Sequence, residues 1–585
     1  MSWQLQRRLK KWLTDETGTI IKDWGGKIPI ALVYPNRYFL GMSNLGFQTV
    51  YHRLNQMPNV VCERVFLPES EDMTAARSGT GPLSVESQRP LADFRIVAFS
   101  VSFENDYANL VHLLQLGKLS LYSSRRRQHE PLVAAGGVAT FLNPEPIAPF
   151  IDVFLLGEAE NLLEEFTAAW QEAQDENASR EEQLVHIARR VSGAYVPSLF
   201  RVENDSEGQL ISFEPLTDIP AKIPVRTAAI EAEGPTVSTI VTPHTEFANT
   251  VLVEIGRGCG RGCRFCAAGF VYRPVRHQQG EKVVQAALDS SPAGRKIGLL
   301  SSAVSDHPDI DAICLQLRQT GARLSVSSLR ADSVTPAMLE ALRESGLRTV
   351  AIAPEAGSER LRQAINKNLT EEQILNAVTA VVGSGILNLR LYFMIGLPTE
   401  TEEDIEAIIQ LVKRVKHEQL VIGRGQKRLG TVTLSVSSFV PKPFTPFQWV
   451  PFSDLSILKR RIKKIRRGLG AVANVRVHAD VPRWAYTQAL LARGDRRLAP
   501  LLATVAEENG NWSKSFKMVN VNPEFYVSRQ REREELFPWD FIDHGVKKDY
   551  LWHEYQQALE GQMTDSCDTD NCVVCGVCGN DWRTG

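Results

Sequence analysis

The first part of the chain alternates short apolar runs with segments long enough to form helices. Five such runs occupy residues 28–34, 60–65, 96–101, 132–135 and 153–156. Continuous apolar runs are typical of strands buried on both faces, because a sheet exposed on one side would alternate apolar with polar positions. The pattern therefore predicts an α/β domain with a parallel, Rossmann-like sheet.

A second and more regular series begins at residue 251. Its strand-like runs are residues 251–255, 297–302, 323–328, 348–353, 389–395 and 431–440. Helical periodicity fills the gaps between them, in residues 281–288, 310–317, 337–342, 374–382 and 405–415. About six consecutive βα units predict a complete or partial (β/α)6 barrel. Such barrels carry their working residues at the carboxyl ends of the strands.

The remaining segments connect or follow these two units. Residues 175–250 contain a polar helix around 180–190 and a hairpin near 200–213, which indicates a connector. Beyond residue 452 the pattern is mostly helical and ends in a cysteine-rich tail. We therefore expect three parts: a Rossmann-like domain with its connector (1–220), a barrel (221–452) and a C-terminal extension (453–585).

Composition narrows the class of protein. The 585 residues are 43% hydrophobic and carry a net charge of −2, which is ordinary for a globular protein and gives no global preference for nucleic acid. No apolar run approaches the roughly twenty residues that span a bilayer, and the N-terminus lacks the apolar core of a signal peptide. We expect a cytoplasmic protein without membrane contact, whose clustered cysteines bind metal rather than form disulfides.

Three of the nine cysteines, Cys259, Cys263 and Cys266, fall in one short loop after the first barrel strand. The glycines between them allow a tight loop that turns three sulfurs toward one point. Three thiolates leave one position of a metal centre open, as in catalytic sites, whereas structural sites are usually closed. Thiolates suit zinc as well as iron–sulfur clusters, so a zinc site with a fourth ligand from elsewhere is the alternative.

The Cys-x3-Cys-x2-Cys spacing, with Phe265 directly before Cys266, resembles the cluster loop of the radical S-adenosylmethionine (SAM) superfamily. The resemblance implies that Cys259, Cys263 and Cys266 hold a 4Fe-4S cluster and that SAM binds its open iron. One electron then cleaves SAM to a 5′-deoxyadenosyl radical, which abstracts hydrogen from an unreactive position. It also implies an electron donor such as flavodoxin or ferredoxin.

Two later strand ends narrow this resemblance. Residues 354–358 read Pro-Glu-Ala-Gly-Ser and residues 396–400 read Gly-Leu-Pro-Thr-Glu, which is similar to radical enzymes related to methylthiotransferases and cobalamin-dependent methylases. The Gly-Gly-Glu segment that binds the methionyl amine in the superfamily is replaced here by Ser-Ser-Ala at residues 301–303. We expect contacts to SAM from residues of the cluster loop and strand ends: Phe265, Ser301, Arg330, Glu355, Gly396 and Pro398.

Residues 28–170 resemble the cobalamin-binding domain that precedes many radical enzymes. Gly136-Gly137 follows the fourth apolar run, and the Gly-Glu-Ala-Glu segment at residues 157–160 follows the fifth. Both lie where open α/β sheets bind ligands. The Asp-x-His-x-x-Gly motif, whose histidine ligates cobalt in many cobalamin proteins, is absent. Either cobalamin is held without that ligand, or the domain keeps only the fold.

Two features of the C-terminal extension have more than one interpretation. Cys567, Cys572, Cys575 and Cys578 can coordinate an auxiliary 4Fe-4S cluster, and their compact spacing favours it over structural zinc. Around residues 455–469 an apolar stripe is flanked by seven cations, Lys459, Arg460, Arg461, Lys463, Lys464, Arg466 and Arg467. This face either binds the phosphates of RNA or is a solvated helix face, and the second interpretation is favoured.

These observations predict a radical SAM enzyme that modifies, and in the leading interpretation methylates, an unreactive C–H position, with RNA as a candidate substrate. The alternative within this class is a methylthiotransferase or rearrangement enzyme without cobalamin. Outside the class, the alternative is a zinc-stabilised nucleic-acid-binding protein. Six barrel strands with polar ends argue against that alternative, since a binding protein has no need of them.

Overall fold

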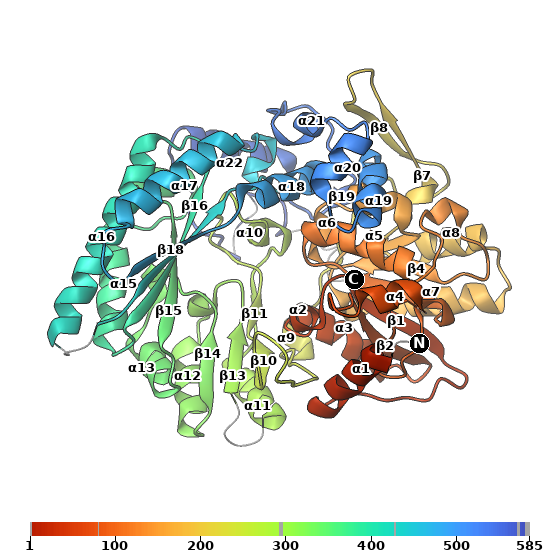
Figure 1. Cartoon of the computed structure of the whole chain (residues 1–585), viewed down its shortest axis with the longest axis horizontal. Helices are drawn as coiled ribbons and strands as arrows, with labels where there is room; N and C mark the ends of the chain where they lie inside the picture. The colour runs from red at the N-terminus through yellow and green to blue at the C-terminus, as the bar shows by residue number, and fades with distance from the viewer. Residues whose placement is uncertain are drawn as a thin grey trace.

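The N-terminal part is built on one six-stranded sheet of order β2-β1-β3-β4-β5-β6 (Figure 1). The computed structural model describes residues 3–79, 81–291, 296–425, 429–569, 572 and 574–578. Five parallel strands match the five predicted runs: β1 (Ile28–Tyr34), β2 (Val60–Phe66), β3 (Ile96–Ser100), β4 (Leu132–Gly136) and β5 (Val153–Leu155). The sixth, β6 (Ala194–Tyr195), pairs antiparallel with β5. Two residues are too short a run to predict from sequence.

The order of the five parallel strands is that of flavodoxin-like sheets, in which the direction of winding reverses between β1 and β3. Helix α3 (Leu45–Gln56) begins at Asn44, whose side chain accepts a hydrogen bond from the Phe47 amide, and packs against β2. Helix α7 (Ala159–Asp175) follows β5 and packs against α3. These two helices therefore cover the same side of the sheet, and helix α5 (Tyr107–Leu116) follows β3.

The central part is a parallel barrel made of two adjoining sheets, drawn green to cyan in Figure 1. The first sheet holds β10 (Thr250–Glu254), β13 (Lys296–Leu300) and β14 (Arg323–Val326). The second holds β15 (Thr349–Glu355), β16 (Asn388–Ile395), β17 (Val432–Ser438) and β18 (Val475–Ala479). A parallel bridge between Leu329 and Ile352 joins the two sheets. The predicted strands lie within a few residues of the observed ones.

The barrel extends beyond the expected boundary at residue 452, because β18 adds a seventh strand beside β17. Helix α17 (Leu455–Leu469), predicted as the start of a separate extension, is the crossover between β17 and β18. Strand β18 escaped prediction because it alternates half-buried positions with exposed ones over only five residues. The other crossover helices are α11 (Gly280–Ser290), α12 (Ile310–Gln319), α13 (Pro336–Glu344), α15 (Glu371–Gly383) and α16 (Glu402–Gly425).

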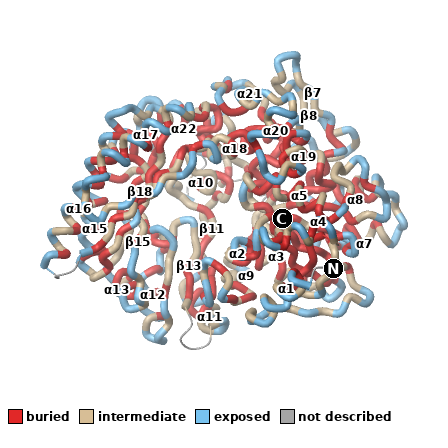
Figure 2. Tube along the Cα trace, in the orientation of Figure 1, coloured by how far each residue is buried: buried red, intermediate tan, exposed pale blue. Residues whose placement is uncertain are grey.

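The C-terminal region ties the two larger parts together, as the blue helices along one side of Figure 1 show. Helix α19 (Ala499–Glu507) packs on α5, and Arg496 forms an ion pair with buried Glu145 of the N-terminal part. Strand β19 (Ile542–Asp543) pairs with β9 (Ile223–Pro224) of the connector, in which the predicted hairpin is β7 (Phe200–Asn204) and β8 (Leu210–Pro215). Figure 2 shows buried positions running through these contacts as well as through each sheet. The remaining C-terminal helices are α18 (Pro482–Arg493), α20 (Trp512–Met518), α21 (Pro523–Val527) and α22 (Lys548–Leu559).

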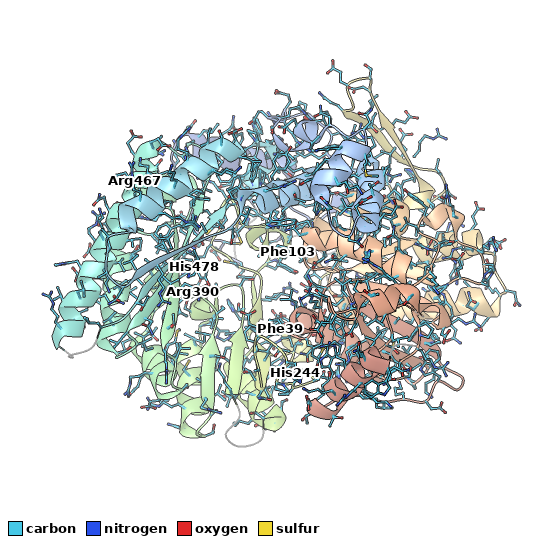
Figure 3. The ribbon with its side chains drawn as sticks, viewed as in Figure 1. Phe39, Phe103, His244, Arg390, Arg467 and His478 are labelled. Atoms are coloured by element: carbon cyan, nitrogen blue, oxygen red, sulfur yellow. The ribbon has the colours of Figure 1, made fainter. Side chains whose placement is uncertain are left out.

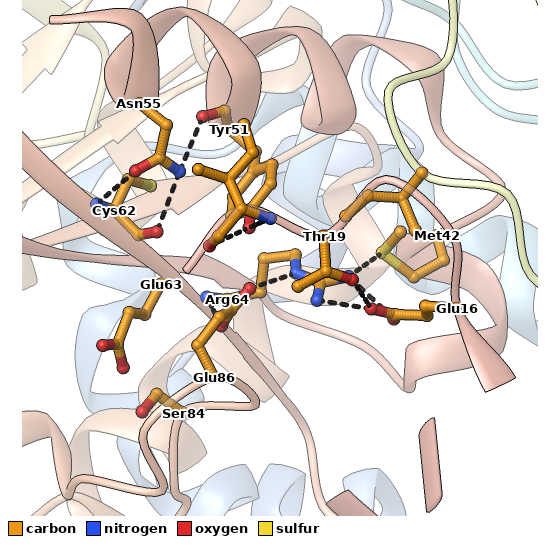
Figure 4. A network of polar contacts seen from close by, with 12 residues as sticks. Glu16, Thr19, Met42, Tyr51, Asn55, Cys62, Glu63, Arg64, Ser84 and Glu86 are labelled. Carbon is orange, nitrogen blue, oxygen red and sulfur yellow. Dashed lines mark hydrogen bonds and ion pairs between the residues drawn. The ribbon is translucent and has the colours of Figure 1, made fainter. Parts of the chain in front are cut away.

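One buried cation organises the outer edge of the N-terminal sheet (Figure 4). The Arg64 side chain on β2 is completely buried and forms ion pairs with Glu16 at 2.7 Å and Glu86 at 2.6 Å. Its guanidinium also lies 5.0 Å from the centre of the Tyr51 ring. Arg64 therefore neutralises two buried carboxylates from segments far apart in the sequence.

Replacing Arg64 with methionine is expected to lower the free energy of unfolding by about 3–5 kcal/mol, because two buried carboxylates lose the cation that they share. Chemical denaturation followed by circular dichroism measures the change. The matched control is Arg533→Met, because the Arg533 side chain is 50% exposed and its pair with Asp549 lies at the surface. We expect that control to change stability by less than about 1 kcal/mol. An equally small effect of R64M would contradict a stabilising role for the buried network.

Asp106, just before α5, makes the stability of the N-terminal part depend on pH. Burial raises the pKa of its carboxyl from an ordinary value of 3.8 to about 6, although Asn36 and Asn109 donate hydrogen bonds to it. Because the folded-state pKa is the higher one, the stabilising effect is complete below about pH 4 and is lost as the pH rises through about 6. In Asp106→Asn this loss cannot occur. Between pH 4 and pH 7, the free energy of unfolding of the variant should rise by roughly 3 kcal/mol relative to that of the parent, as measured in unfolding titrations. Parallel pH profiles of the two proteins would contradict the assignment.

Candidate functional site

The cluster loop begins where β10 ends and lies at the carboxyl end of the first barrel strand. It is closed by a short antiparallel pair, β11 (Gly256–Arg257) with β12 (Arg276–His277). Gly258 has a φ of +86°, and a Cβ there would lie 2.4 Å from the Tyr272 carbonyl oxygen. Only glycine fits this position, so the loop turns sharply before the first cysteine.

The three predicted cluster ligands share one neighbourhood within this loop. Cys263 is 8% exposed, and its carbonyl oxygen accepts a hydrogen bond from the Cys266 amide at 3.0 Å. Burial, together with the charges of Cys263 and Cys259, raises the pKa of the Cys266 thiol to about 12. Within the described residues, no three His, Cys, Asp or Glu side chains converge to the spacing of ligands around a single ion. In a 4Fe-4S cluster each thiolate binds a different iron atom, so that spacing is not required.

Hydrogen bonds between arginine and aspartate side chains connect the cluster loop to the segments that follow β13 and β14. Arg261 of the loop makes two hydrogen bonds of 2.8 Å to Asp306, which follows β13. It also reaches Asp332, which follows β14, at 3.4 Å. Arg330 pairs with the same Asp332 at 2.9 Å and lies close enough to Cys259 and Cys263 to interact with their thiolates. A cation thus lies beside the expected cluster ligands.

The structure gathers some of the expected SAM contacts more closely than others. Glu355 at the end of β15 has a φ of +67° and forms an ion pair with Lys367 at 3.3 Å. The Lys367 carbonyl oxygen accepts a hydrogen bond from Arg330, so Glu355 and Arg330 belong to one polar group. The positive φ of a glutamate is a strained conformation of the kind found at functional sites.

The other four expected contacts have different surroundings. Phe265 is half-buried within the cluster loop, and Pro398 is half-buried after β16. Ser301 is among the residues that line the cavity described below. Gly396 has a φ of +84°, and a Cβ there would lie 2.8 Å from the Leu458 side chain of α17, so the backbone conformation and packing already favour glycine there. A role of Gly396 in approaching adenosine therefore stays a prediction.

A cavity of about 540 Å³ opens at the carboxyl edge of the N-terminal sheet and faces the barrel. Its floor is made of small and apolar side chains at paired positions of β1, β3 and β4: Leu32, Ala98 and Ala134 in one row, with Ser100 and Gly136 in the next. Thr49, Val50 and Leu54 of α3 and Leu162, Leu163 and Phe166 of α7 form its wall. It lies at the β1/β3 switch point, where open α/β sheets bind ligands. The predicted glycine segments at 136–137 and 157–160 both border it.

A polar group that was not predicted closes the cavity on the barrel side. Arg257, next to the cluster loop, forms ion pairs with Glu158, Glu160 and Glu254 at 2.8–2.9 Å. Arg276 adds a second cation to Glu158 at 2.6 Å. These contacts join the Gly-Glu-Ala-Glu segment to the cluster loop across about one hundred residues of sequence. The signal available in the sequence was the pair of glutamates in that segment, but their partners come from another part of the chain.

The predicted basic face of α17 lies on the outside of the barrel. Arg461 and Lys464 pair with Glu400 and Glu402, which leaves five cations without an ion pair among the described residues: Lys459, Arg460, Lys463, Arg466 and Arg467. In Figure 3, Arg467 lies at the outer edge of the molecule, whereas Arg390 and His478 lie on the side that faces the N-terminal part. The basic helix is therefore not part of the barrel interior.

Comparison with known proteins places this geometry in a class. Residues 46–197 match the family described as "Radical SAM proteins, N-terminal", and residues 253–412 match the "Radical SAM superfamily". The chain therefore belongs to the radical SAM superfamily, whose members use a 4Fe-4S cluster and SAM. It is 30% identical over 478 residues to "Uncharacterized protein MJ0966" of Methanocaldococcus jannaschii, a match that covers 81% of this chain and 90% of that relative. The alternative of a zinc-stabilised binding protein has no support from these matches.

Two further similarities cover less of the chain. A "tRNA-2-methylthio-N(6)-dimethylallyladenosine synthase" of Sorangium cellulosum is 26% identical over 238 residues, which is 36% of this chain and 47% of that relative. The solved structure of the radical SAM methyltransferase TsrM of Kitasatospora setae aligns with a TM-score of 0.44 at 13% identity, over 69% of this chain and 72% of that one. No helix in the described ranges is both long and apolar enough to cross a membrane.

Proposed function

We propose that this radical SAM enzyme is a methyltransferase that acts on an unreactive carbon and binds cobalamin in the N-terminal cavity. The cavity is the observation that carries the proposal. Its volume of about 540 Å³ lies within the range of cofactor sites, and its lining is mainly apolar with a few polar groups. A spacer domain that kept only the fold would be expected to fill this space with side chains, because protein interiors are close-packed.

The residues around the cavity are compatible with cobalamin in their chemistry. Small side chains at Ala98, Ala134 and Gly136 keep the floor low, and a Cβ at Gly137 would lie 2.5 Å from the Val101 carbonyl oxygen. No histidine is among the residues that line the cavity. This agrees with the missing cobalt-ligand motif, so in this proposal cobalamin is held without a histidine ligand. When bound, cobalamin supplies a methyl carrier at the edge of the barrel.

The barrel residues would hold SAM and its cluster. Cys259, Cys263 and Cys266 are the cluster ligands in this proposal, and the 4Fe-4S cluster supplies the electron that cleaves SAM. Arg330 lies where it can bind the carboxylate of SAM, and Glu355 where it can accept hydrogen bonds from ribose hydroxyls. The Arg257 ion-pair group, between the cavity and the cluster loop, would align the two cofactor sites and restrict water between them.

The inner face of the barrel favours an anionic substrate, and we propose RNA. Arg390 of β16 and Arg476 of β18 flank Thr433 of β17 in register, and His478 lies one row further along. All three cationic or titratable side chains are exposed and make no ion pair within the part of the chain that the structure describes. Phe39 and Phe103 on the facing N-terminal part are about half exposed and could stack on bases (Figure 3). The electron donor in this proposal is of the flavodoxin or ferredoxin class.

The substrate proposal makes a prediction that separates the inner face from the outer helix. The double variant Arg390→Gln with Arg476→Gln should weaken RNA binding at least about tenfold. The slope of log K against log salt concentration should become shallower by the equivalent of about two phosphate contacts. The matched control, Arg466→Gln with Arg467→Gln, removes the same charge from the outside of α17 and should change binding less than about threefold. Fluorescence anisotropy with total RNA fragments measures both. A larger loss in the α17 variant would assign RNA binding to that helix, and no binding by the parent protein would remove RNA as the substrate.

Labelled cosubstrate tests the methyltransferase proposal. The full chain is purified anaerobically, supplied with iron, sulfide and cobalamin, and incubated with reductant and SAM carrying a trideuterated methyl group. A mass increase of 17 in an RNA nucleoside, found only with cobalamin present, is the expected result. A methylthio product made without cobalamin would favour the methylthiotransferase alternative, and cobalamin that does not bind would overturn the proposal.

A further inference from the structure

The C-terminal tail is hydrogen-bonded directly to the cluster loop. The Cys567 amide donates to the Gly260 carbonyl oxygen at 2.7 Å, and Gly260 is the residue that follows the first cluster cysteine. A Cβ built on Gly260 would lie 3.7 Å from the Cys567 Cβ. The first tail cysteine therefore lies in van der Waals reach of the loop that surrounds the SAM site, although about three hundred residues separate them in the sequence.

Buried polar contacts hold this arrangement in place. Arg264, between the second and third cluster cysteines, is completely buried and pairs with Glu554 of α22 at 3.1 Å. It also donates to the Thr564 hydroxyl at 3.0 Å. Asn366 donates to the Gly262 carbonyl oxygen at 3.2 Å and accepts from the Thr564 amide at 2.9 Å. The segment that leads into the tail is thus anchored on both sides of the cluster loop.

The other three tail cysteines lie near Cys567, and a buried cation interacts with two of the four. Cys572, Cys575 and Cys578 all lie close enough to Cys567 to act on the charge of its thiolate. Cys575 is 2% exposed, and its carbonyl oxygen accepts from the Lys547 amide at 2.9 Å. Arg273, which is 4% exposed, hydrogen-bonds the Cys575 thiol and also interacts with Cys567.

Arg273 lies between the tail and the cluster loop. Its guanidinium would be 3.5 Å from a Cβ on Gly262, and it is held by the Gly269 carbonyl oxygen at 2.7 Å and the Tyr550 hydroxyl at 3.2 Å. A buried arginine among thiolates compensates negative charge, and two anionic metal centres placed side by side need that compensation. A tail that only ordered the chain end would not require a cation on the side of the SAM site.

We propose that Cys567, Cys572, Cys575 and Cys578 hold a second 4Fe-4S cluster that passes electrons to the cluster of the SAM site. Four cysteines satisfy all four iron atoms, so no position is open for substrate, which leaves electron transfer as its chemistry. One electron enters the tail cluster from a one-electron donor of the flavodoxin or ferredoxin class, and the same electron moves to the SAM-site cluster. There it breaks the sulfonium S–C5′ bond into methionine and the 5′-deoxyadenosyl radical. This relay rests on the proposed function only in requiring SAM cleavage, not in requiring methyl transfer.

Metal content tests the cluster itself. The full chain, reconstituted anaerobically, should contain about eight iron and eight sulfide, and Cys572→Ser with Cys575→Ser should contain about four of each. The matched control Cys314→Ser removes a buried cysteine of α12, which belongs to neither loop, and should keep about eight. Cys578→Ser, a change at a half-buried position, repeats the test if the double variant does not fold. One zinc per chain that is lost in the double variant, or an unchanged iron count, would overturn the proposal.

Electron paramagnetic resonance and two reductants test the relay. The reduced parent should show two interacting cluster signals, whereas the double variant should show one narrow signal that still responds to SAM. With reduced flavodoxin, release of 5′-deoxyadenosine should fall at least tenfold in the double variant, but with dithionite, a small reductant, it should fall less than threefold. Equal rates with flavodoxin would overturn the relay while leaving the second cluster. Loss of cleavage in the parent itself would instead count against the proposed function.

Discussion

Replacing Cys263 with alanine is expected to abolish release of 5′-deoxyadenosine from SAM, by at least roughly 10³-fold. The three thiols act as one unit, so loss of one ligand removes most of the function of the set. Cys263 is the most buried of the three, and the backbone around it is fixed by the Arg264 amide, which donates to the Ile365 carbonyl oxygen at 3.0 Å. The loop should therefore keep its conformation in the variant while losing iron. Chromatography of the products after reduction with dithionite measures the loss.

Two controls make this result specific to the cluster. Cys62→Ala removes a fully buried cysteine in the N-terminal sheet and should leave SAM cleavage within about twofold of the parent, apart from a stability loss of about 1 kcal/mol. Iron and sulfide content should fall by about four each in Cys263→Ala, and the tail cysteines should still hold their own metal. If Cys263→Ala cleaves SAM at a rate near that of the parent, then these three cysteines are not the ligands of the SAM cluster.

Filling the N-terminal cavity is expected to abolish cobalamin binding. Ala98 lies on the floor of the cavity between Leu32 and Ala134, and it is not fully buried because it faces the open space. A phenylalanine at this position would occupy the space without displacing the sheet, so its cost in stability should be below about 1.5 kcal/mol. We expect the Kd for cobalamin to rise at least about 100-fold, equivalent to about 2.7 kcal/mol. Absorbance titration with hydroxocobalamin measures it.

The matched variant at the same position is Ala98→Ser, which keeps the cavity open and should change the Kd by less than about threefold. SAM cleavage to 5′-deoxyadenosine should survive in both variants, because the cluster loop lies in the barrel. Methyl transfer should be lost only in Ala98→Phe. Normal cobalamin affinity in Ala98→Phe would show that the cofactor binds elsewhere or that the cavity has another ligand.

The strands were the most predictable feature of this protein. The predicted run at residues 28–34 coincides with β1, and residues 389–395 differ from β16 by one residue at the start. The first run is nearly continuous in apolar residues, and the second alternates buried with less buried positions. Both patterns are typical of strands in a buried sheet. Strand β18 was missed because its three apolar positions, Val475, Val477 and Ala479, form a short run that is only half-buried and alternates with exposed Arg476 and His478.

Some residues of the site could likewise be predicted from the sequence, and others could not. The cysteines of both loops could be read from spacing, because a metal centre needs several ligands close together in the chain or in space. The residues that position those loops could not. Arg257, Arg264 and Arg273 have partners about one hundred to three hundred residues away, and their neighbours in the sequence do not reveal those partners.

The sequence by itself indicated the class of enzyme through its resemblance to a known family, and it indicated the two α/β units and the candidate metal-binding cysteines through local periodicity and spacing. The tertiary structure alone decided that the basic helix faces outward, that a cavity of about 540 Å³ opens between the two units, and that the tail lies against the cluster loop. Each of these is a contact between segments distant in the chain. Their free energy comes from burial and from hydrogen bonds formed only after folding, which no local pattern of residues records.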